Sequence, residues 1–267
     1  MAQPLPQELS QVVTNRLMLL LHNIGHLGLV DPMEHKRFER DIATIEKTNA
    51  DHAHLLRSVL ASLDGDLDCA EHWAMNAARL NNSQANRVRL FTLANLGYAT
   101  RGLRLARESL RAGEPDVSGS FSAAIAVGAF STVMSVVNAT PAASQMLASV
   151  ANPSIALARR GADALARMGT TEEDLAAVLD VAGEVQREHR LLWLDQQPGI
   201  MVLSGDEGGD EGDDGAPAVH VSYRVDMSPR EAAEVTLQVA DRLAQRDIMP
   251  VGISVSFVGS QIERVAA

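Results

Sequence analysis

The sequence contains a single cysteine, few aromatic residues and no broad excess of positive charge. One thiol, Cys69, excludes an intramolecular disulfide and any metal site built from several thiolates, and it favours a reducing compartment. Phe, Trp and Tyr make up 3% of the 267 residues, so we expect a core of Ala, Leu, Val and Met, as in closely packed helices. Cys69 lies in an Ala-rich stretch and is predicted to be a small buried side chain there.

The formal net charge is -11, and a large part of it lies in one segment. Residues 205–216, "GDEGGDEGDDGA", hold six acidic residues and no basic one. The rest of the chain is only mildly acidic, so it has no basic field that would attract a phosphate backbone, and we expect no nucleic-acid partner. The first residues, "MAQPLPQELSQVV", lack the basic-then-apolar order of a signal peptide, which predicts a cytoplasmic protein.

Residues 117–157 contain no Asp, Glu, Lys, Arg or His. A membrane span needs about 20 strongly apolar residues, usually with a basic flank on one side. Here Ser, Thr, Gly and Ala dilute the segment and the basic flank is missing. We therefore predict a buried or interfacial helix and no association with a membrane.

Apolar residues recur at helical spacing over most of residues 8–197, which predicts an all-α part made of antiparallel hairpins. Asp31 followed by Pro32 predicts a capped helix start. Near residue 171 either of two pairs, Thr171 with Asp174 or Thr170 with Glu173, would form an N-terminal capping pattern.

The pattern changes after Gly199. Residues 218–227 and 251–257 alternate strictly between apolar and other residues, and 200–204 is a short apolar run, which predicts three strands. A helix starting at Ser228 and Pro229 separates the last two strands. The predicted fold is therefore mainly α: a helical-hairpin domain over residues 1–198, then a small α/β domain over 199–267 with the order β-loop-β-α-β. The acidic segment 205–216 is expected to be a mobile loop in this second domain.

Three strands leave two open sheet edges, and exposed edges tend to pair with another strand. A second copy or a partner chain would satisfy them, and the helical part covering them would do so equally well. We expect a homo-oligomer assembled through a sheet edge.

The stretch "GDLDCAEHWAMNAARLNN", residues 65–82, and a second stretch 32 residues later share a turn followed by small residues on one helical face. The residues proposed to pack these hairpins are small or apolar: Gly65, Ala70, Ala77 and Leu80 in the first copy, and Gly97, Gly102 and Ala106 in the second. Together they resemble tetratricopeptide repeats over roughly residues 52–112. No third copy is evident beyond Gly113, and an irregular helical bundle is the competing interpretation. The resemblance implies a concave surface that receives a peptide or helix of another protein.

Candidate catalytic and metal-binding residues are few. His22 and His26 are one helical turn apart, but two ligands do not close a metal site. Arg16 and His22 have the Arg-x5-His spacing that resembles a motif of some helical ribonucleases, in which His acts as the base and Arg binds the phosphate. Gly-rich phosphate loops and nucleophile elbows are missing from the sequence, so we predict no cofactor, no metal and no catalytic residue.

The prediction for function is a non-enzymatic interaction or adaptor protein. Its helical groove would bind another protein, and its α/β unit would serve assembly. A dedicated inhibitor or chaperone of one partner protein is an alternative. A second alternative, from a different class of function, is a helical ribonuclease using Arg16 and His22.

Overall fold

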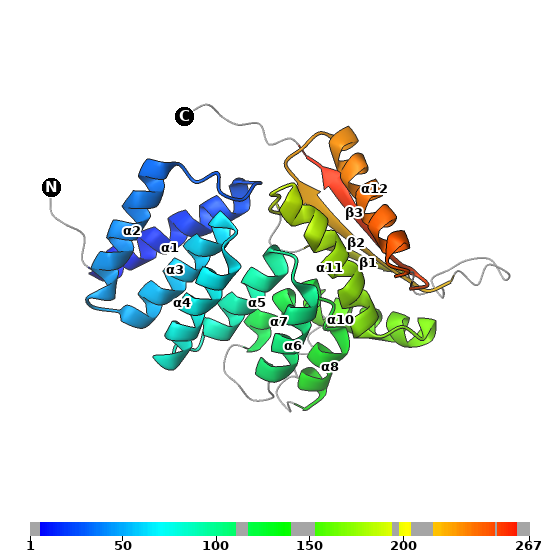
Figure 1. Cartoon of the computed structure of the whole chain (residues 1–267). Coiled ribbons are helices and arrows are strands. Elements are labelled where there is room, and N and C mark those ends of the chain that lie inside the picture. The colour runs from blue at the N-terminus through cyan, green and yellow to red at the C-terminus, as the bar shows by residue number, and fades with distance from the viewer. Residues whose placement is uncertain are drawn as a thin grey trace.

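The computed structural model describes residues 6–110, 117–139, 153–193, 198–203, 216–248 and 250–260. In this part of the chain ten helices are followed by a three-stranded mixed sheet with one further helix (Figure 1). The ten helices are α1 (Pro6–Asn23), α2 (Pro32–Glu46), α3 (Ala50–Asp64), α4 (Leu67–Arg79), α5 (Ala85–Asn95), α6 (Ala99–Ser109), α7 (Val117–Ala126), α8 (Phe130–Ala139), α10 (Pro153–Met168) and α11 (Glu172–Glu188). The sheet unit consists of β1 (Gly199–Leu203), β2 (Ala218–Val225), α12 (Pro229–Gln245) and β3 (Ile253–Gly259). The predicted mainly α fold, ending in three strands and one helix in the order β-β-α-β, is confirmed. Residues 205–215, which carry the acidic segment predicted to be a mobile loop, lie outside the described part.

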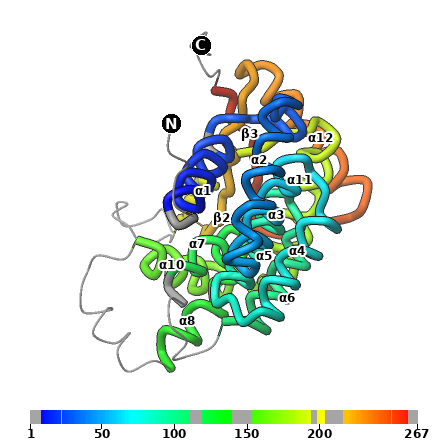
Figure 2. Tube along the Cα trace, turned by 90° about the vertical axis from the view of Figure 1, so that its left-hand side faces the viewer, coloured from blue at the N-terminus to red at the C-terminus, as the bar shows by residue number. Residues whose placement is uncertain are grey.

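The first helices pack in sequence as two rows. In one row α1, α3, α5 and α7 each contact the next member. The other row, α2, α4 and α6, fills the outside, and each of its helices contacts the two helices that flank it in the chain. Figure 2 shows this order as a continuous run of colour from blue to green through the helical part.

The turns inside three successive helix pairs have the same backbone geometry. Gly65, Gly97 and Gly128 all have positive φ angles, of 82°, 67° and 83°. In each turn the residue after the glycine donates its N–H to the carbonyl five positions earlier: Asp66 to Ala61, Tyr98 to Leu93 and Ala129 to Ala124. A left-handed residue followed by this hydrogen bond is a common way to end a helix. A third hairpin with the same turn, α7–α8, therefore follows the two that the sequence suggested.

Side-chain caps fix several helix starts as predicted. The Asp31 carboxylate accepts hydrogen bonds from the N–H groups of the first turn of α2. Of the two possibilities near residue 171, the structure forms the one between Thr171 and Asp174, as a reciprocal capping box. Ser228 and Glu231 form a second capping box at the start of α12.

In the described part of the charge-free segment, residues 117–139 and 153–157, two short helices and the start of α10 stand in place of the one predicted helix. Helices α7 and α8 are separated by the turn at Gly128, and residues 140–152 lie outside the described part. Phe121, Val127, Phe130 and Val133 are almost fully buried, so the small residues of this segment serve close packing. Among the residues that the structure describes, no helix combines the length and the apolar character that crossing a membrane requires.

The sheet has the strand order β1-β2-β3, with β1 antiparallel and β3 parallel to β2. Val219, Val221, Tyr223 and Val225 of β2 are buried on one face, which helices α10 and α11 cover. The other face, which we call the open face, carries Met201 and Leu203 of β1, His220 and Ser222 of β2, and Ser254, Ser256 and Val258 of β3. On it the His220 ring hydrogen-bonds both Ser254 Oγ (2.8 Å) and Ser256 Oγ (3.0 Å).

The helical part and the sheet unit are joined at the end of α11. The loop after α1 pairs with the segment after α11, since Leu27 N–H donates to Arg190 O (2.7 Å) and Leu192 N–H donates to Gly25 O (2.8 Å). The Arg190 guanidinium also donates to Leu27 O. Helix α11 further contacts α12 and β3. The loop after α1, helix α11 and the sheet therefore lie next to one another (Figure 1).

Candidate functional site

A hollow of about 250 Å³ opens on the row of helices formed by α1, α3 and α5. Its apolar lining consists of Met18, Leu21, Val59, Val88, Phe91, Leu192 and Trp193. Its polar lining comes from Ser62 of α3, from Gln84 at the N-cap of α5, and from Arg87, Thr92 and Asn95 of α5. We call this hollow the inner groove. It is a mainly apolar surface with polar groups concentrated along α5.

Local sequence explains which side chains reach the inner groove. Met18 and Leu21 are three residues apart on α1, as are Val88 and Phe91 on α5, so each pair shares one helical face. The opposite side of α5 is buried through Leu90 and Leu93. Because α5 has apolar residues on two opposite sides, one side packs in the core and the other lines the groove.

Trp193 closes the groove at the end nearest the sheet. It is only 5% exposed, and its Nε1–H donates to Gln186 Oε1 (3.1 Å). Its ring lies 5.1 Å from the ring of Tyr223, which is 5.4 Å from that of Phe257. Burial raises the pKa of the Tyr223 hydroxyl well above its ordinary value. Trp193 therefore connects this end of the groove to the aromatic core under the sheet.

Helix α11 holds the α5–α6 turn through side chains that bind main-chain groups. Gln186, which is 1% exposed, donates from Nε2 to Asn95 O (2.6 Å) and Leu191 O (3.1 Å). Arg187 Nη1 donates to Leu96 O and Gly97 O, both at 2.7 Å. These bonds satisfy the last carbonyls of α5 and fix that helix relative to Trp193.

Two glycines allow α11 to approach this turn at backbone contact. A Cβ placed on Gly183 would lie 1.9 Å from Gly97 O, and one on Gly97 would lie 2.3 Å from Gly183 Cα. Gly97 is thus required for its positive φ and for the close approach of Gly183.

The residues predicted to pack the hairpins lie mostly inside the helical part. Ala70, Ala77 and Ala106 are fully buried, and a Cβ on Gly102 would lie 2.6 Å from a methyl of Val127. Gly65 ends α3 in a left-handed conformation. None of these residues lines the inner groove, since they hold the rows of helices together.

Two expectations for this region are corrected. Leu80 is 48% exposed because it lies at the C-terminal cap of α4, where the helix face that buries Ala77 has already ended. Cys69 is half-buried, since it lies next to the buried face of α4 that Ala70 and Ala74 occupy.

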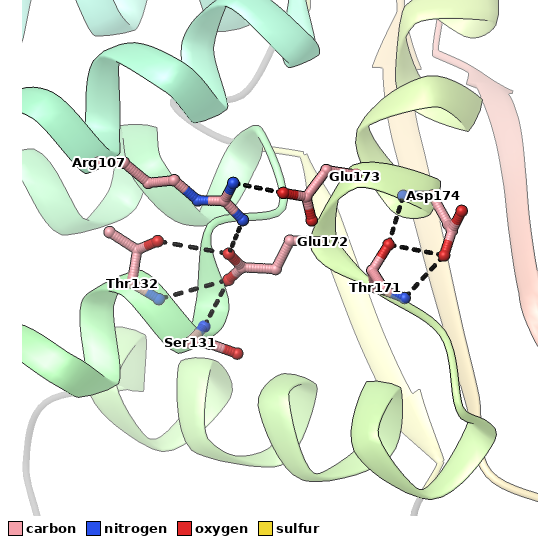
Figure 3. Close-up of polar contacts among 7 residues, drawn as sticks. All are labelled: Arg107, Ser131, Thr132, Thr171, Glu172, Glu173 and Asp174. Carbon is pink, nitrogen blue, oxygen red and sulfur yellow. Dashed lines mark hydrogen bonds and ion pairs between the residues drawn. The ribbon is translucent and has the colours of Figure 1, made fainter.

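A polar network joins α6, α8 and α11 (Figure 3). Glu172, 7% exposed, accepts hydrogen bonds from the N–H of Ser131 (2.6 Å), the N–H of Thr132 (3.4 Å) and Arg107 Nη2 (2.9 Å). Arg107 also hydrogen-bonds Glu173. The hydrogen bonds to Glu173 and Glu172 raise the pKa of the guanidinium, and the hydrogen bond from Arg107 lowers the pKa of Glu173. The Glu172 carboxylate therefore caps the N-terminus of α8, which is a structural role.

Of the two residues of the predicted ribonuclease motif, Arg16 lies at a different hollow. Arg16 lines an open depression of about 640 Å³ with Lys36, Arg37, Arg40, Asp31, Glu34 and Met33. Its Nη2 lies 2.9 Å from Glu34 Oε1, and its guanidinium lies over the ring of Phe38, 4.7 Å from the centroid. The side chain of His22 lies outside the described part.

His26 is the second member of the histidine pair considered as metal ligands. Its ring Nε2 lies 3.1 Å from the carbonyl oxygen of Asp226. Within the described ranges no three His, Cys, Asp or Glu side chains come together in a way that could hold a metal ion.

No protein-family model matches this chain, and no similar curated protein or solved structure was found. A role for the candidate site can therefore be inferred only from its own geometry.

Proposed function

We propose that this protein is a non-enzymatic interaction or adaptor protein whose inner groove binds a peptide or helix of a partner protein. The observation that carries the proposal is the apolar groove on the α1, α3 and α5 row. Pockets for drug-sized ligands usually have about 300–1,000 Å³, so a hollow of about 250 Å³ suits one or two anchoring side chains better than a whole cofactor. Apolar anchors on one face of a helix are a common way to fill such a groove.

The row arrangement supports a repeat-like reading of the helical part. Three successive turns at Gly65, Gly97 and Gly128 are spaced by 32 and 31 residues, close to the period of about 34 residues in tetratricopeptide repeats. In such repeats the stacked helical hairpins form an extended concave binding surface. Helices α1, α3 and α5 stack as one row here, and they supply most of the groove lining.

Assembly is the role proposed for the α/β unit. Its sheet has few strands and one face exposed, and its buried face is attached to α10 and α11. A unit of this kind can join two copies while the inner groove of each stays accessible.

The test compares two neighbouring residues of α1. Met18 lines the groove and is 43% exposed, whereas Leu19 is 64% exposed and does not line it. A displayed library of amphipathic helical peptides is selected against the wild type. We expect the selected peptides to lose affinity at least tenfold for Met18→Glu and to bind Leu19→Glu normally, because burying one Met side chain is worth about 1.5–3 kcal/mol. Peptides that bind both variants equally would place the binding surface elsewhere.

A dedicated inhibitor or chaperone of one partner protein uses the same groove and is the alternative within this class. It predicts one stoichiometric partner with high affinity, whereas an adaptor binds several partners that share a motif. Selected peptides with one narrow consensus would favour the inhibitor, and a loose apolar pattern would favour the adaptor.

A helical ribonuclease using Arg16 and His22 is the alternative from another class. The open depression that Arg16 shares with Lys36, Arg37 and Arg40 favours it. The ion pair between Arg16 and Glu34 weighs against it, because a phosphate would have to displace that carboxylate. RNA cleavage that is lost in His22→Ala and kept in Leu19→Glu would establish this alternative and remove the adaptor proposal.

A further inference from the structure

The two edges of the sheet differ in what they offer to another strand. Outside β2, none of the residues that the structure describes hydrogen-bonds to the main chain of β1. Strand β1, "GIMVL", contains no charged residue, and Met201 and Leu203 are 53% and 50% exposed on the open face. Soluble proteins usually protect a free edge with charges, proline or a bulge. Strand β1 contains neither a charged residue nor a proline.

The edge of β3 is closed by α12. The Phe257 N–H donates to Thr236 Oγ1 (2.8 Å), and the hydroxyl hydrogen of Thr236 has both Ala232 O (2.9 Å) and Phe257 O (3.4 Å) within reach. Helix α12 contacts β3 along its length, and its buried residues Ala232, Val235 and Val239 face the core. The Phe257 N–H on this edge is therefore already satisfied, and α12 lies against the strand.

A sheet with one open edge can extend only once. If strands added at both edges, copies would join head to tail and form a filament. With β3 closed, the contact available to identical copies is β1 against β1, related by a two-fold axis, and it forms a closed dimer.

We propose that two copies of this protein pair β1 with β1 in antiparallel orientation, centred on Met201, to form a continuous six-stranded sheet. This inference deepens the assembly role proposed above for the α/β unit. The residues of β1 are self-complementary in this register. Gly199 of one copy, which has no side chain, lies opposite Leu203 of the other, and Ile200 lies opposite Val202 on the covered face. Met201 lies opposite the same residue of the second copy, and the open face adds no like-charge pair at the junction.

The first experiment uses the charge at position 201. Mass is measured by light scattering over a protein concentration of about 1–100 µM, since a short strand pair gives a small interface. The wild type is expected to change from monomer to dimer over this range. Met201→Glu and Met201→Lys are each expected to raise the dimer dissociation constant at least tenfold, and an equimolar mixture of the two variants is expected to recover the dimer. Val258→Glu is the matched control, since Val258 is 48% exposed on the same face but lies on the closed edge.

A second measurement does not depend on charge. In a Cys69→Ala background, Met201→Cys places two thiols on residues that face each other across an antiparallel pair, at a Cα distance of about 4.5–5.5 Å, which suits a disulfide. Oxidation is expected to give a covalent dimer with Met201→Cys and none with Val258→Cys.

Three results would overturn the inference: a wild type that stays monomeric over the whole range, a mixture of the Glu and Lys variants that stays monomeric, or equal cross-linking of both cysteine variants. A monomer that still binds peptides in the inner groove would refute the β1 dimer alone. A β1 dimer with an empty groove would refute the binding role alone.

Discussion

Gly183→Ala tests the backbone contact that positions the inner groove. The added methyl would lie 1.9 Å from Gly97 O, whereas real Cβ atoms almost never come within 3.0 Å of another heavy atom. Helix α11 and the α5–α6 turn would therefore have to separate by about 1 Å. That movement stretches the bonds from Gln186 to Asn95 O (2.6 Å) and from Arg187 to the turn (2.7 Å) beyond hydrogen-bonding range.

The expected loss of stability follows from these contacts. Overpacking costs about 1–3 kcal/mol, and leaving a buried amide or carbonyl unpaired costs about 1–3 kcal/mol more. Alanine is favoured over glycine inside a helix by about 1 kcal/mol, which offsets part of the loss. We therefore expect the free energy of unfolding to fall by about 3 kcal/mol, a large share of the roughly 5–15 kcal/mol that a natural protein has.

Urea denaturation followed by circular dichroism measures this change, with the wild type and Gly169→Ala alongside. Gly169 has a positive φ of 64°, unlike Gly183, and a Cβ on Gly169 meets nothing within 4 Å. Gly169→Ala therefore shows the cost of a left-handed alanine without a clash, about 1–2 kcal/mol, whereas Gly183→Ala shows the cost of the clash without a left-handed backbone. A Gly183→Ala protein within about 1 kcal/mol of the wild type would refute the contact between α11 and the α5–α6 turn.

Two further predictions concern carboxylates at helix contacts. Glu172→Gln is expected to lower the free energy of unfolding by about 1–3 kcal/mol, because it weakens the cap on α8 and leaves Arg107 without its buried partner. Glu173→Gln, at a side chain that is 61% exposed, is expected to change it by less than about 1 kcal/mol in the same urea titration, and equal effects would contradict the buried cap. The hydrogen bond from Arg242 lowers the pKa of Glu188 below its ordinary value of 4.5, so this pair stabilises the fold above pH 4.5, and its contribution is lost as the pH falls through the lowered pKa. Melting temperatures measured from pH 7 down to pH 3 should therefore drop less steeply below pH 5 in Arg242→Ala than in the wild type, whereas parallel curves would exclude the pair as a source of acid sensitivity.

Local sequence signals predicted the elements whose causes are local. Period-two alternation identified β2 and β3, and Ser228 and Asp31 marked the starts of helices where their side chains now cap the first turns. Apolar periodicity predicted the mainly helical part. The fold class followed from these patterns because each of them depends on neighbours within a few residues.

The charge-free segment shows where such signals fail. Ser, Ala and Gly make up most of α7, so its helical period is weak. The turn at Gly128 was hidden for the same reason, and with it the third hairpin. Its positive φ becomes visible only in the structure.

The candidate site depended on contacts between distant segments. Gly183 looks like an ordinary helical glycine until Gly97 is placed against it. Trp193 follows α11 in the chain but closes a groove formed by α1, α3 and α5. Thr236 closes a sheet edge through its hydroxyl, and no local pattern distinguishes it from the other threonines. Of the groove lining, only the apolar pairs on the outer sides of α1 and α5 gave a signal that the sequence alone could have shown.

The measurement that tests the binding role most directly is a fluorescence titration of the inner groove. Trp193 lines the groove and Trp73 does not, so a Trp73→Phe background leaves one reporter at the site. Peptides selected on the wild type are titrated into this protein and into its Met18→Glu and Leu19→Glu forms. We expect a saturable change in Trp193 emission, at least tenfold weaker binding in the Met18→Glu form, and unchanged binding in the Leu19→Glu form. Binding that leaves Trp193 emission unchanged, or that survives Met18→Glu intact, would contradict a binding role for the inner groove.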